Sequence, residues 1–376
     1  MGKHVVLVGG GHAHLTILLN LAGYIQKGHR VTLVSPSPYH YYSGMGPGLL
    51  SGIYRPRDVR FHVQKMAEDR GATFIEDKVV RVDPSNKMLD LQSGKQVAYD
   101  IVSFNTGSDV RLPKMGSEPR ENIVPVKPVF NLLRTRRFLV PLLKESPIDF
   151  VVVGGGPAGV EIAANLWRLV NETRGKGTFK IVAGHRLLAN FPERVRLLAF
   201  RSLTERGITV VEGSHVKEAT RNEICLSDGS THPFDFAFMA LGVQPSRLFL
   251  DSGLPVAPDG GLLVNSFLHS VRYPEMFGGG DCVSLSQKPL ARVGVYAVRQ
   301  NPILFHNLLA AMERREMKAF VPQRDYMLIF NMGNGRGILW KKNFVWEGRL
   351  PFLLKDYIDR KFMRKFQVSG ESHAED

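Results

Sequence analysis

The residues with the clearest chemical meaning are three glycines, Gly154, Gly156 and Gly159, in the segment FVVVGGGPAGVE at 150–161. They follow an apolar run typical of a buried parallel strand, and a helix is expected to begin near Val160. In a G-x-G-x-x-G loop the glycines permit a tight turn, close approach of the backbone to a pyrophosphate, and close packing of helix on strand. The N–H groups that open the helix would face the same anion. The spacing therefore predicts a dinucleotide site.

A second glycine-rich loop lies near the start of the chain, in VLVGGGHAHL. Gly9 and Gly11 take the first two fingerprint positions, but His14 stands at the third, so we expect the next helix to lie slightly farther from the strand. Ser35 ends the second strand of this β-α-β unit, where an acid commonly holds a ribose hydroxyl. Dinucleotide binding is favoured here, and an ordinary β-α turn is the alternative.

Three further strands end in residues suited to a ligand. Two of them lead into the segments NTG and ALG, so that Gly107 and Gly242 would let the backbone lie against a bound group. The segment MFGGGDCVSL places Gly280 and Asp281 at the end of a third strand, where the carboxylate suits a sugar-like hydroxyl. An alternative role for Asp281 is to cap the next helix. The helix that begins near Ala297 would point back at the same region.

Arg186 follows the second strand of the 150–161 unit, in the segment AGHR. No acid stands at this strand end, and an arginine there can hold a 2′-phosphate. This favours NADPH over NADH. The alternative is an arginine that is simply solvated.

The composition limits the class of protein. At 376 residues the chain is long enough for two or three domains with sizeable cores. No apolar run reaches the roughly 18 residues of a membrane-spanning helix, and the first residues lack a signal-peptide pattern. Cys225 and Cys282 lie far apart, which argues against disulfides and metal ligation and favours a reducing, cytoplasmic compartment. The net charge of +14 suits phosphate-bearing cofactors or an anionic membrane; without a motif for it, nucleic acid is not expected.

These motifs, in this order, resemble the flavoproteins with two dinucleotide-binding domains: pyridine nucleotide–disulfide oxidoreductases, type II NADH dehydrogenases and sulfide:quinone oxidoreductases. The segments VLVGGGHAHL, SPSPYHYYSGMGPGLLSG, GVYAVRQNP and KDYIDRKFMRKF also resemble the flavoprotein domain fused to selenide, water dikinase in some organisms. The resemblance implies an α/β fold of two Rossmann-like three-layer domains. An FAD-binding domain would span 1–111 and 248–322, an inserted NAD(P)H-binding domain 112–247, and a small C-terminal α+β segment 323–376.

The resemblance also implies a reaction: a hydride passes from NAD(P)H to FAD, and electrons then leave to a quinone-like acceptor. Glu161 would face the junction of nicotinamide and flavin, and Gln300 is retained from a glutamine pattern beside the quinone. Lone cysteines disfavour disulfide or sulfide chemistry. A flavin-bearing redox sensor and a selenium-linked reductase are the alternatives. The residues assigned to cofactor binding are Gly9, Gly11, His12, Ser35, Gly107, Gly154, Gly156, Gly159, Arg186, Gly242, Gly280, Asp281 and Ala297.

Near its end the chain predicts an amphipathic helix over 350–366. Leu354, Ile358, Phe362 and Phe366 recur every four residues, and lysines and arginines crowd the other surface. Such a helix is typical of peripheral binding to an anionic membrane, here the inner face of the cell membrane. The alternative is a helix docked on the body of the protein or on a second copy in a homodimer.

Overall fold

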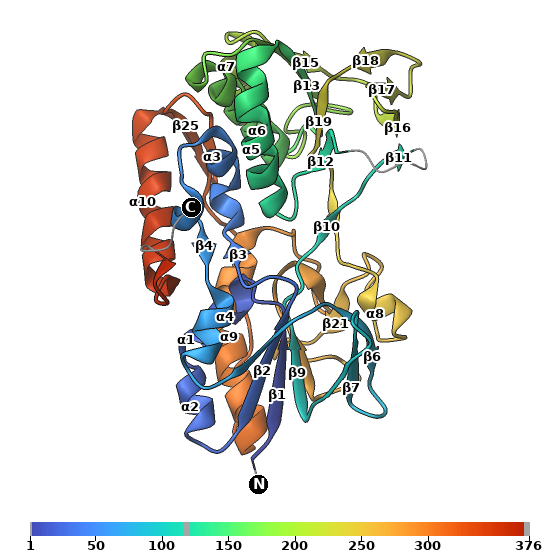
Figure 1. Cartoon of the computed structure of the whole chain (residues 1–376), viewed down its shortest axis with the longest axis vertical. Helices are drawn as coiled ribbons and strands as arrows, with labels where there is room; N and C mark the ends of the chain where they lie inside the picture. The colour runs from blue at the N-terminus through green and yellow to red at the C-terminus, as the bar shows by residue number, and fades with distance from the viewer. Residues whose placement is uncertain (1, 116–120, 372–376) are drawn as a thin grey trace.

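The computed structural model describes residues 2–115 and 121–371, and its main features are two parallel five-stranded sheets covered by helices (Figure 1). Residues 1, 116–120 and 372–376, which the expected domain boundaries include, lie outside the described residues. The α/β architecture expected from the two glycine-rich units is confirmed.

The first sheet has the strand order β22-β9-β1-β2-β5, and all its pairings are parallel. Its strands are apolar almost throughout because both faces are covered. The last of its strands in chain order, β22, closes the edge beside β9, so segments far apart in the sequence build this sheet. Its strands are β1 (His4–Val8), β2 (Arg30–Ser35), β5 (Thr73–Glu76), β9 (Ile101–Phe104) and β22 (Met276–Gly278). The helices around it are α1 (Leu15–Leu19), α2 (Leu21–Ile25), α4 (Val63–Glu68) and α9 (Gly294–Glu313).

The second sheet has the order β12-β19-β13-β14-β15, again all parallel, and it lies in the upper half of Figure 1. It has its own hydrophobic core. Its strands are β12 (Ile123–Pro125), β13 (Ile148–Val153), β14 (Gly177–Val182), β15 (Ile208–Val211) and β19 (Phe236–Met239). Its helices are α5 (Phe130–Glu145), α6 (Pro157–Glu172) and α7 (Glu193–Thr204).

Short strands join the two halves and extend each of them. The chain passes between the halves along β10 (Asp109–Val110) and β20 (Val243–Gln244), which pair antiparallel. Beside the first sheet lie β3 (His40–Tyr41), β4 (Arg60–Phe61), β6 (Val79–Asp83), β7 (Met88–Leu91), β8 (Gln96–Ala98), β21 (Leu262–Val264), β23 (Val283–Leu285) and α8 (Leu248–Asp251). The helix α3 (Gly46–Ser51) packs against α5 and α6 of the second half. Beside the second sheet lie β11 (Lys114–Met115), β16 (Val216–Ala219), β17 (Glu223–Leu226) and β18 (Thr231–Pro233).

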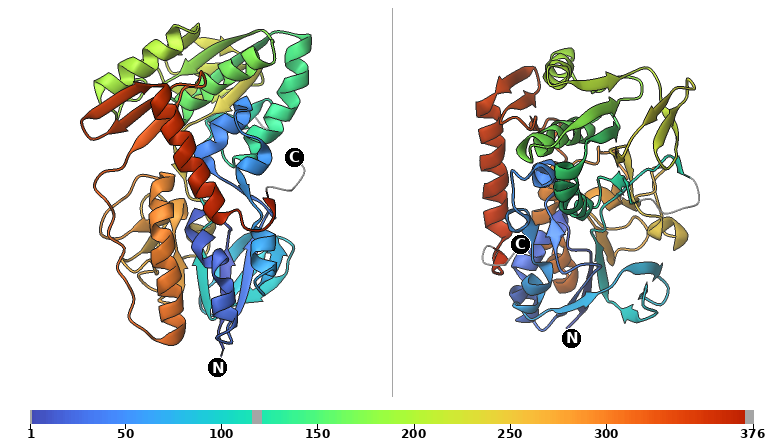
Figure 2. Two further views of the ribbon diagram at one scale, coloured as in Figure 1. Left: turned by 90° about the vertical axis from the view of Figure 1, so that its left-hand side faces the viewer. Right: turned by 45° about the horizontal axis from the view of Figure 1, so that its top comes forward.

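The C-terminal segment is a small antiparallel sheet followed by the helix α10 (Arg349–Phe366). Figure 2 shows α10 running from this sheet along the side of the molecule towards the first half. The strands are β24 (Leu328–Asn331), β25 (Gly337–Lys341) and β26 (Phe344–Gly348).

The predicted apolar stripe of α10 is wrong in its detail. Phe362 and Phe366 pack inward against Phe61, whereas Leu354 and Ile358 are 37% and 38% exposed on the outer side. A helix turns about 100° per residue, so positions four apart drift about 40° at each step. Over three steps the row therefore moves from the outer side of the helix to the inner side.

Candidate functional site

The second fingerprint has the geometry that its glycines predict. Gly154 has φ +125°, and a Cβ atom there would collide with the carbonyl oxygen of Ala240. A Cβ atom on Gly159 would collide with the carbonyl oxygen of Gly154, so the helix α6 packs directly on the turn. In contrast, a Cβ atom on Gly156, at the N-cap of α6, would meet nothing within 4 Å. Two glycines therefore permit close packing, and the middle one leaves open space for a ligand.

That open space belongs to a cavity of about 370 Å³ at the carboxyl edge of the second sheet. Gly154, Gly156 and Gly242 line it, together with the ends of β14 and β19. The carboxyl edge of a parallel sheet is where dinucleotides bind in doubly wound folds. The structure thus brings three of the predicted residues together in one cavity.

Arg186 lies elsewhere. Its guanidinium donates a hydrogen bond of 2.6 Å to Glu193 Oε2 at the start of α7, and it does not line the cavity. The role predicted for Arg186 at a 2′-phosphate remains a prediction.

The first fingerprint is tied to the neighbouring strand ends by Asn105. Gly9 has φ +88° and lies against the Asn105 backbone, and a Cβ atom on Gly11 would collide with the Asn105 side chain. The Asn105 Oδ1 atom accepts a hydrogen bond of 3.0 Å from the Ala13 N–H, and its Nδ2 atom donates one of 2.6 Å to the Gly279 carbonyl. One amide side chain therefore joins this loop to the GGGD turn. The sequence signal for it was its place in the NTG motif after β9.

His14 replaces the third glycine by hydrogen bonding. Its ring is fully buried, with Nδ1 2.6 Å from the Gly9 carbonyl oxygen and Nε2 2.8 Å from Ser103 Oγ. A carbonyl oxygen only accepts, so Nδ1 carries the proton and Nε2 accepts from the serine hydroxyl. Burial lowers the pKa of His14 to about 4, which keeps the ring neutral. In the first unit the imidazole of His14 therefore links the glycine turn to the helix. In the second unit Gly159 allows the helix to contact the turn directly.

His12 points into an aromatic cluster. Its Nδ1 atom lies 3.3 Å from His40 Nε2, and its ring also contacts Tyr42 and stacks on Phe362 of α10. Burial and then the charge of Lys127 lower the pKa of His12 to about 4, and burial also lowers that of His40. Among the described residues, His12 Nε2 is a buried nitrogen without a hydrogen-bond partner. The role predicted for His12 in cofactor binding remains a prediction.

Asp281 is paired with a lysine that the sequence analysis missed. Its Oδ2 atom accepts hydrogen bonds from Lys127 Nζ at 2.7 Å and from Ser108 Oγ at 2.8 Å. Lys127 lies in the segment VKPVF, between β12 and α5 of the second half. No local pattern marks it, because its partner is far along the sequence.

The remaining predicted residues of the first unit contact other parts of the protein near this site. Gln300 Oε1 accepts a hydrogen bond of 2.7 Å from the Gly280 N–H, so the glutamine holds the GGGD turn. Ala297 is buried beside Gly280. The Ser35 hydroxyl donates to the Ser37 carbonyl oxygen, and Gly107 adopts φ +72°.

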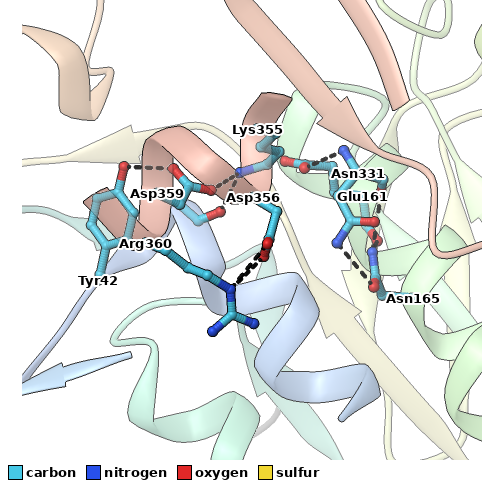
Figure 3. Close-up of polar contacts among 9 residues, drawn as sticks. Tyr42, Glu161, Asn165, Asn331, Lys355, Asp356, Asp359 and Arg360 are labelled. Carbon is cyan, nitrogen blue, oxygen red and sulfur yellow. Dashed lines mark hydrogen bonds and ion pairs between the residues drawn. The ribbon is translucent and has the colours of Figure 1, made fainter. Parts of the chain in front are cut away.

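Glu161 lies near the start of α6, two residues after Gly159, in a polar cluster between α6 and α10 (Figure 3). Its Oε1 atom accepts a hydrogen bond of 2.7 Å from the Asn331 N–H. Lys355 Nζ donates to Asp359 Oδ2 and to the Gly44 carbonyl oxygen, both at 2.7 Å. The cluster thus joins α6, α10 and the loop before α3.

Burial governs the ionisation of this cluster. It raises the pKa of Glu161 to about 7, although Lys355 and the Asn331 N–H oppose the rise. Burial alone would lower the pKa of Lys355, but the carboxylates of Asp359 and Glu161 outweigh it and the net shift is upward. Glu161 is therefore poised to gain or lose a proton near neutral pH, next to a lysine that stays charged.

The fold and the two glycine-rich loops define a class of protein. A family model described as pyridine nucleotide-disulphide oxidoreductase matches residues 3–302, and the chain belongs to this family. The external alternative NAD(P)H-ubiquinone oxidoreductase B2 of Arabidopsis thaliana mitochondria is 25% identical over 325 residues, which cover 76% of this chain and 55% of the relative. The type II NADH:quinone oxidoreductase of Haemophilus influenzae is 23% identical over 369 residues, which cover 85% of this chain and 82% of the relative.

Solved structures agree with the fold. The structure of NDH2 from Plasmodium falciparum in complex with NADH matches with a TM-score of 0.82 at 15% identity, covering 99% of this chain and 98% of that chain. This likeness confirms the α/β architecture with two parallel sheets. The chain spans about half the length of two external alternative NAD(P)H-ubiquinone oxidoreductases of Arabidopsis thaliana, B2 and B3, 55% in each case.

Proposed function

We propose that the chain is an FAD-dependent NAD(P)H oxidoreductase, which passes a hydride from nicotinamide to flavin and electrons onward to a quinone-like acceptor. The observation that carries the proposal is the pair of glycine fingerprints, each at the carboxyl edge of its own parallel sheet. The names of the Arabidopsis and Haemophilus relatives support the acceptor, because both name a quinone. They favour this function over a redox sensor and over the selenium-linked reductase suggested by the resemblance to the selenide, water dikinase-fused domain.

The residues of the first unit fit FAD. The loop from Gly9 to His12 offers backbone N–H groups to a pyrophosphate, and the carboxylate of Asp281 suits a ribityl or ribose hydroxyl. Lys127 compensates the charge of Asp281. Bound there, FAD would supply the hydride-accepting ring. We assign 1–111 and 248–322 to this FAD-binding domain and 323–376 to the C-terminal domain.

The cavity of the second unit fits a nicotinamide nucleotide. Gly156 leaves open space at the start of α6, where helix N–H groups favour a phosphate. Gly154 and Gly159 hold turn and helix together, and Gly242 continues the wall of the cavity. We assign 112–247 to this NAD(P)H-binding domain.

Two residues are proposed for catalysis: Glu161 at the junction of nicotinamide and flavin, and Gln300 beside the quinone-like acceptor. Glu161, with its pKa raised to about 7 by burial, holds or releases a proton at its carboxylate under neutral conditions. Gln300 uses its Oε1 atom on Gly280 and keeps its amide N–H groups as donors for an acceptor. Both roles rest on the family resemblance.

The outer side of α10 supports peripheral binding to a membrane. Among residues 2–115 and 121–371, no helix is both long and apolar enough to cross a bilayer. However, α10 exposes an apolar stripe at helical spacing, and three exposed cations continue it. The stripe is Leu350, Leu353, Leu354, Tyr357 and Ile358, and the cations are Lys361, Arg364 and Lys365. Cations beside apolar side chains suit the anionic inner leaflet, so we place the protein on the inner face of the cell membrane. A homodimer through the same stripe is the competing arrangement.

An anaerobic spectral titration tests the function. The purified flavoprotein should bleach on addition of NADPH or NADH and regain its colour when a short-chain quinone is added. Gly156→Glu is the matched variant: residue 156 has an extended backbone and open surroundings, so the protein should fold and keep FAD. Its new carboxylate should repel the nucleotide, while dithionite still bleaches the flavin. A wild-type flavin untouched by both nucleotides would refute the proposal.

A further inference from the structure

One corner of the nucleotide cavity lacks the residue that usually reads the ribose. In doubly wound folds an acid at the end of the second strand holds the ribose 2′-hydroxyl, and a cation there accepts a 2′-phosphate. Here that strand is β14, which ends at Val182, and the next residues that line the cavity are Ala183 and Gly184. Neither has a polar side chain.

His215 occupies this corner from the neighbouring loop. Its ring lies over Gly184, with Nδ1 3.0 Å from the point where a Cβ atom on residue 184 would stand. Gly184 also has φ +69°, so a side chain there would be strained as well as crowded. The small residue after β14 therefore makes room for an imidazole that comes from another segment.

The position of His215 is fixed by its backbone. Its N–H donates to Ser227 Oγ at 3.2 Å, and its carbonyl oxygen accepts from the Ser227 N–H at 2.8 Å. The preceding Ser214 forms a β-bridge with Gly184. These contacts hold the loop against the end of β14 and leave the imidazole for a ligand.

The charged groups nearby are engaged with one another. Arg186 pairs with Glu193, and Arg196 pairs with Glu193 at 2.9 Å and with Glu212 at 3.7 Å. None of these four residues lines the cavity. Of the described residues that do line it, His215 is the one with a polar side chain.

We propose that His215 is the residue that determines nucleotide specificity, by donating a hydrogen bond to the 2′-phosphate of NADPH. This inference rests on the proposed function, in which the cavity holds a nicotinamide nucleotide. A ring N–H suits a phosphate oxygen. Among the described residues of the lining none carries a carboxylate, so the repulsion by which NADH-specific sites exclude NADPH does not arise from them.

Calorimetric titration of the FAD-loaded protein with 2′,5′-ADP and with 5′-AMP tests the proposal without turnover. Wild type should bind 2′,5′-ADP about tenfold more tightly than 5′-AMP, the gain of one charge-assisted hydrogen bond. His215→Ala and His215→Gln should bring the two affinities within about twofold, with binding of 5′-AMP unchanged. His232→Ala, on β18 and outside the cavity lining, is the matched control and should behave as wild type. The ratio of kcat/KM for NADPH and NADH should follow the same order.

Three results would overturn the inference. The first is equal binding of 2′,5′-ADP and 5′-AMP by wild type, and the second is an unchanged preference in both His215 variants. The third is loss of the preference in Arg186→Ala but not in His215→Ala, which would return the role to Arg186. Any of these three results leaves the proposed oxidoreductase function intact as long as NADPH or NADH bleaches the flavin. If neither nucleotide bleaches the flavin, the proposed function is refuted.

Discussion

At the scale of single residues, His14 shows how a fingerprint tolerates a large side chain. The ring replaces helix–turn contact with two hydrogen bonds, to Gly9 and Ser103. We expect His14→Gly to leave a cavity and a buried hydroxyl with one partner fewer, at a cost of about 2–4 kcal/mol. Urea unfolding of the FAD-loaded protein measures this loss.

Adding a side chain at the matching position of the second unit gives a comparison for His14→Gly. Gly159→Ala should also destabilise the protein, because its Cβ atom would meet the Gly154 carbonyl. If His14→Gly were neutral or stabilising, the imidazole would not have the structural role that its contacts indicate.

Glu161 gives a second prediction at this scale. Its folded-state pKa is raised from 4.5 to about 7 by burial, so the folded protein holds a proton that the unfolded chain releases above pH 4.5. This contribution to stability is complete below pH 4.5 and is lost as the pH rises through 7. Glu161→Gln keeps an acceptor for the Asn331 N–H but removes the titration.

The melting temperatures of the two proteins from pH 5 to 8 test this expectation. The melting temperature of the wild type should fall relative to that of Glu161→Gln as the pH rises. The difference at pH 8 should correspond to a loss of up to about 3 kcal/mol in the free energy of unfolding. Parallel curves would show that Glu161 does not titrate in this range.

At the scale of elements, much could be predicted from the sequence because the signals are local. The apolar runs of β1 and β13 and the glycines after them identify both β-α-β units before any contact is known. The inner and outer sides of α10 could not be assigned, because a row at four-residue spacing drifts around the helix. The pairings of Lys127 with Asp281 and of Arg186 with Glu193 also depend on tertiary folding.

The helix α10 carries the prediction for membrane binding. In sedimentation with phosphatidylglycerol vesicles, the double change Leu353→Glu, Tyr357→Glu should lower the bound fraction at least about tenfold, because it places two carboxylates in the exposed stripe. Wild-type binding should also weaken with salt and on neutral vesicles. Val321→Glu is the control, since Val321 is 80% exposed but lies outside α10. Stable dimers in solution that the double change dissociates, without vesicle binding, would favour the homodimer instead.

At the scale of the whole molecule, the two halves and the C-terminal helix meet over buried ionisable groups, so stability should depend on pH. His12 and His14 are buried and His40 is half-buried; burial lowers the pKa of each, to about 4 for the first two, so the three rings are neutral at pH 7. For such histidines the unfolded chain binds protons below pH 6.5 that the folded protein refuses. Their contribution is therefore present above pH 6.5 and is lost as the pH falls towards 4.

The contributions of the histidines and of Glu161 together predict how the free energy of unfolding changes with pH. For His12 and His14, lowering the pKa from 6.5 to about 4 corresponds to about 3 kcal/mol each, and His40 shifts in the same direction, whereas Glu161 acts in the opposite direction. Urea unfolding of the FAD-loaded protein should show a net loss of several kcal/mol between pH 7 and pH 4.5. His185→Asn, a change at an exposed histidine, is the control variant. A stability that is flat or rises on acidification would mean that the cluster joining the glycine loop to α10 opens to water and that its histidines titrate as in the unfolded chain.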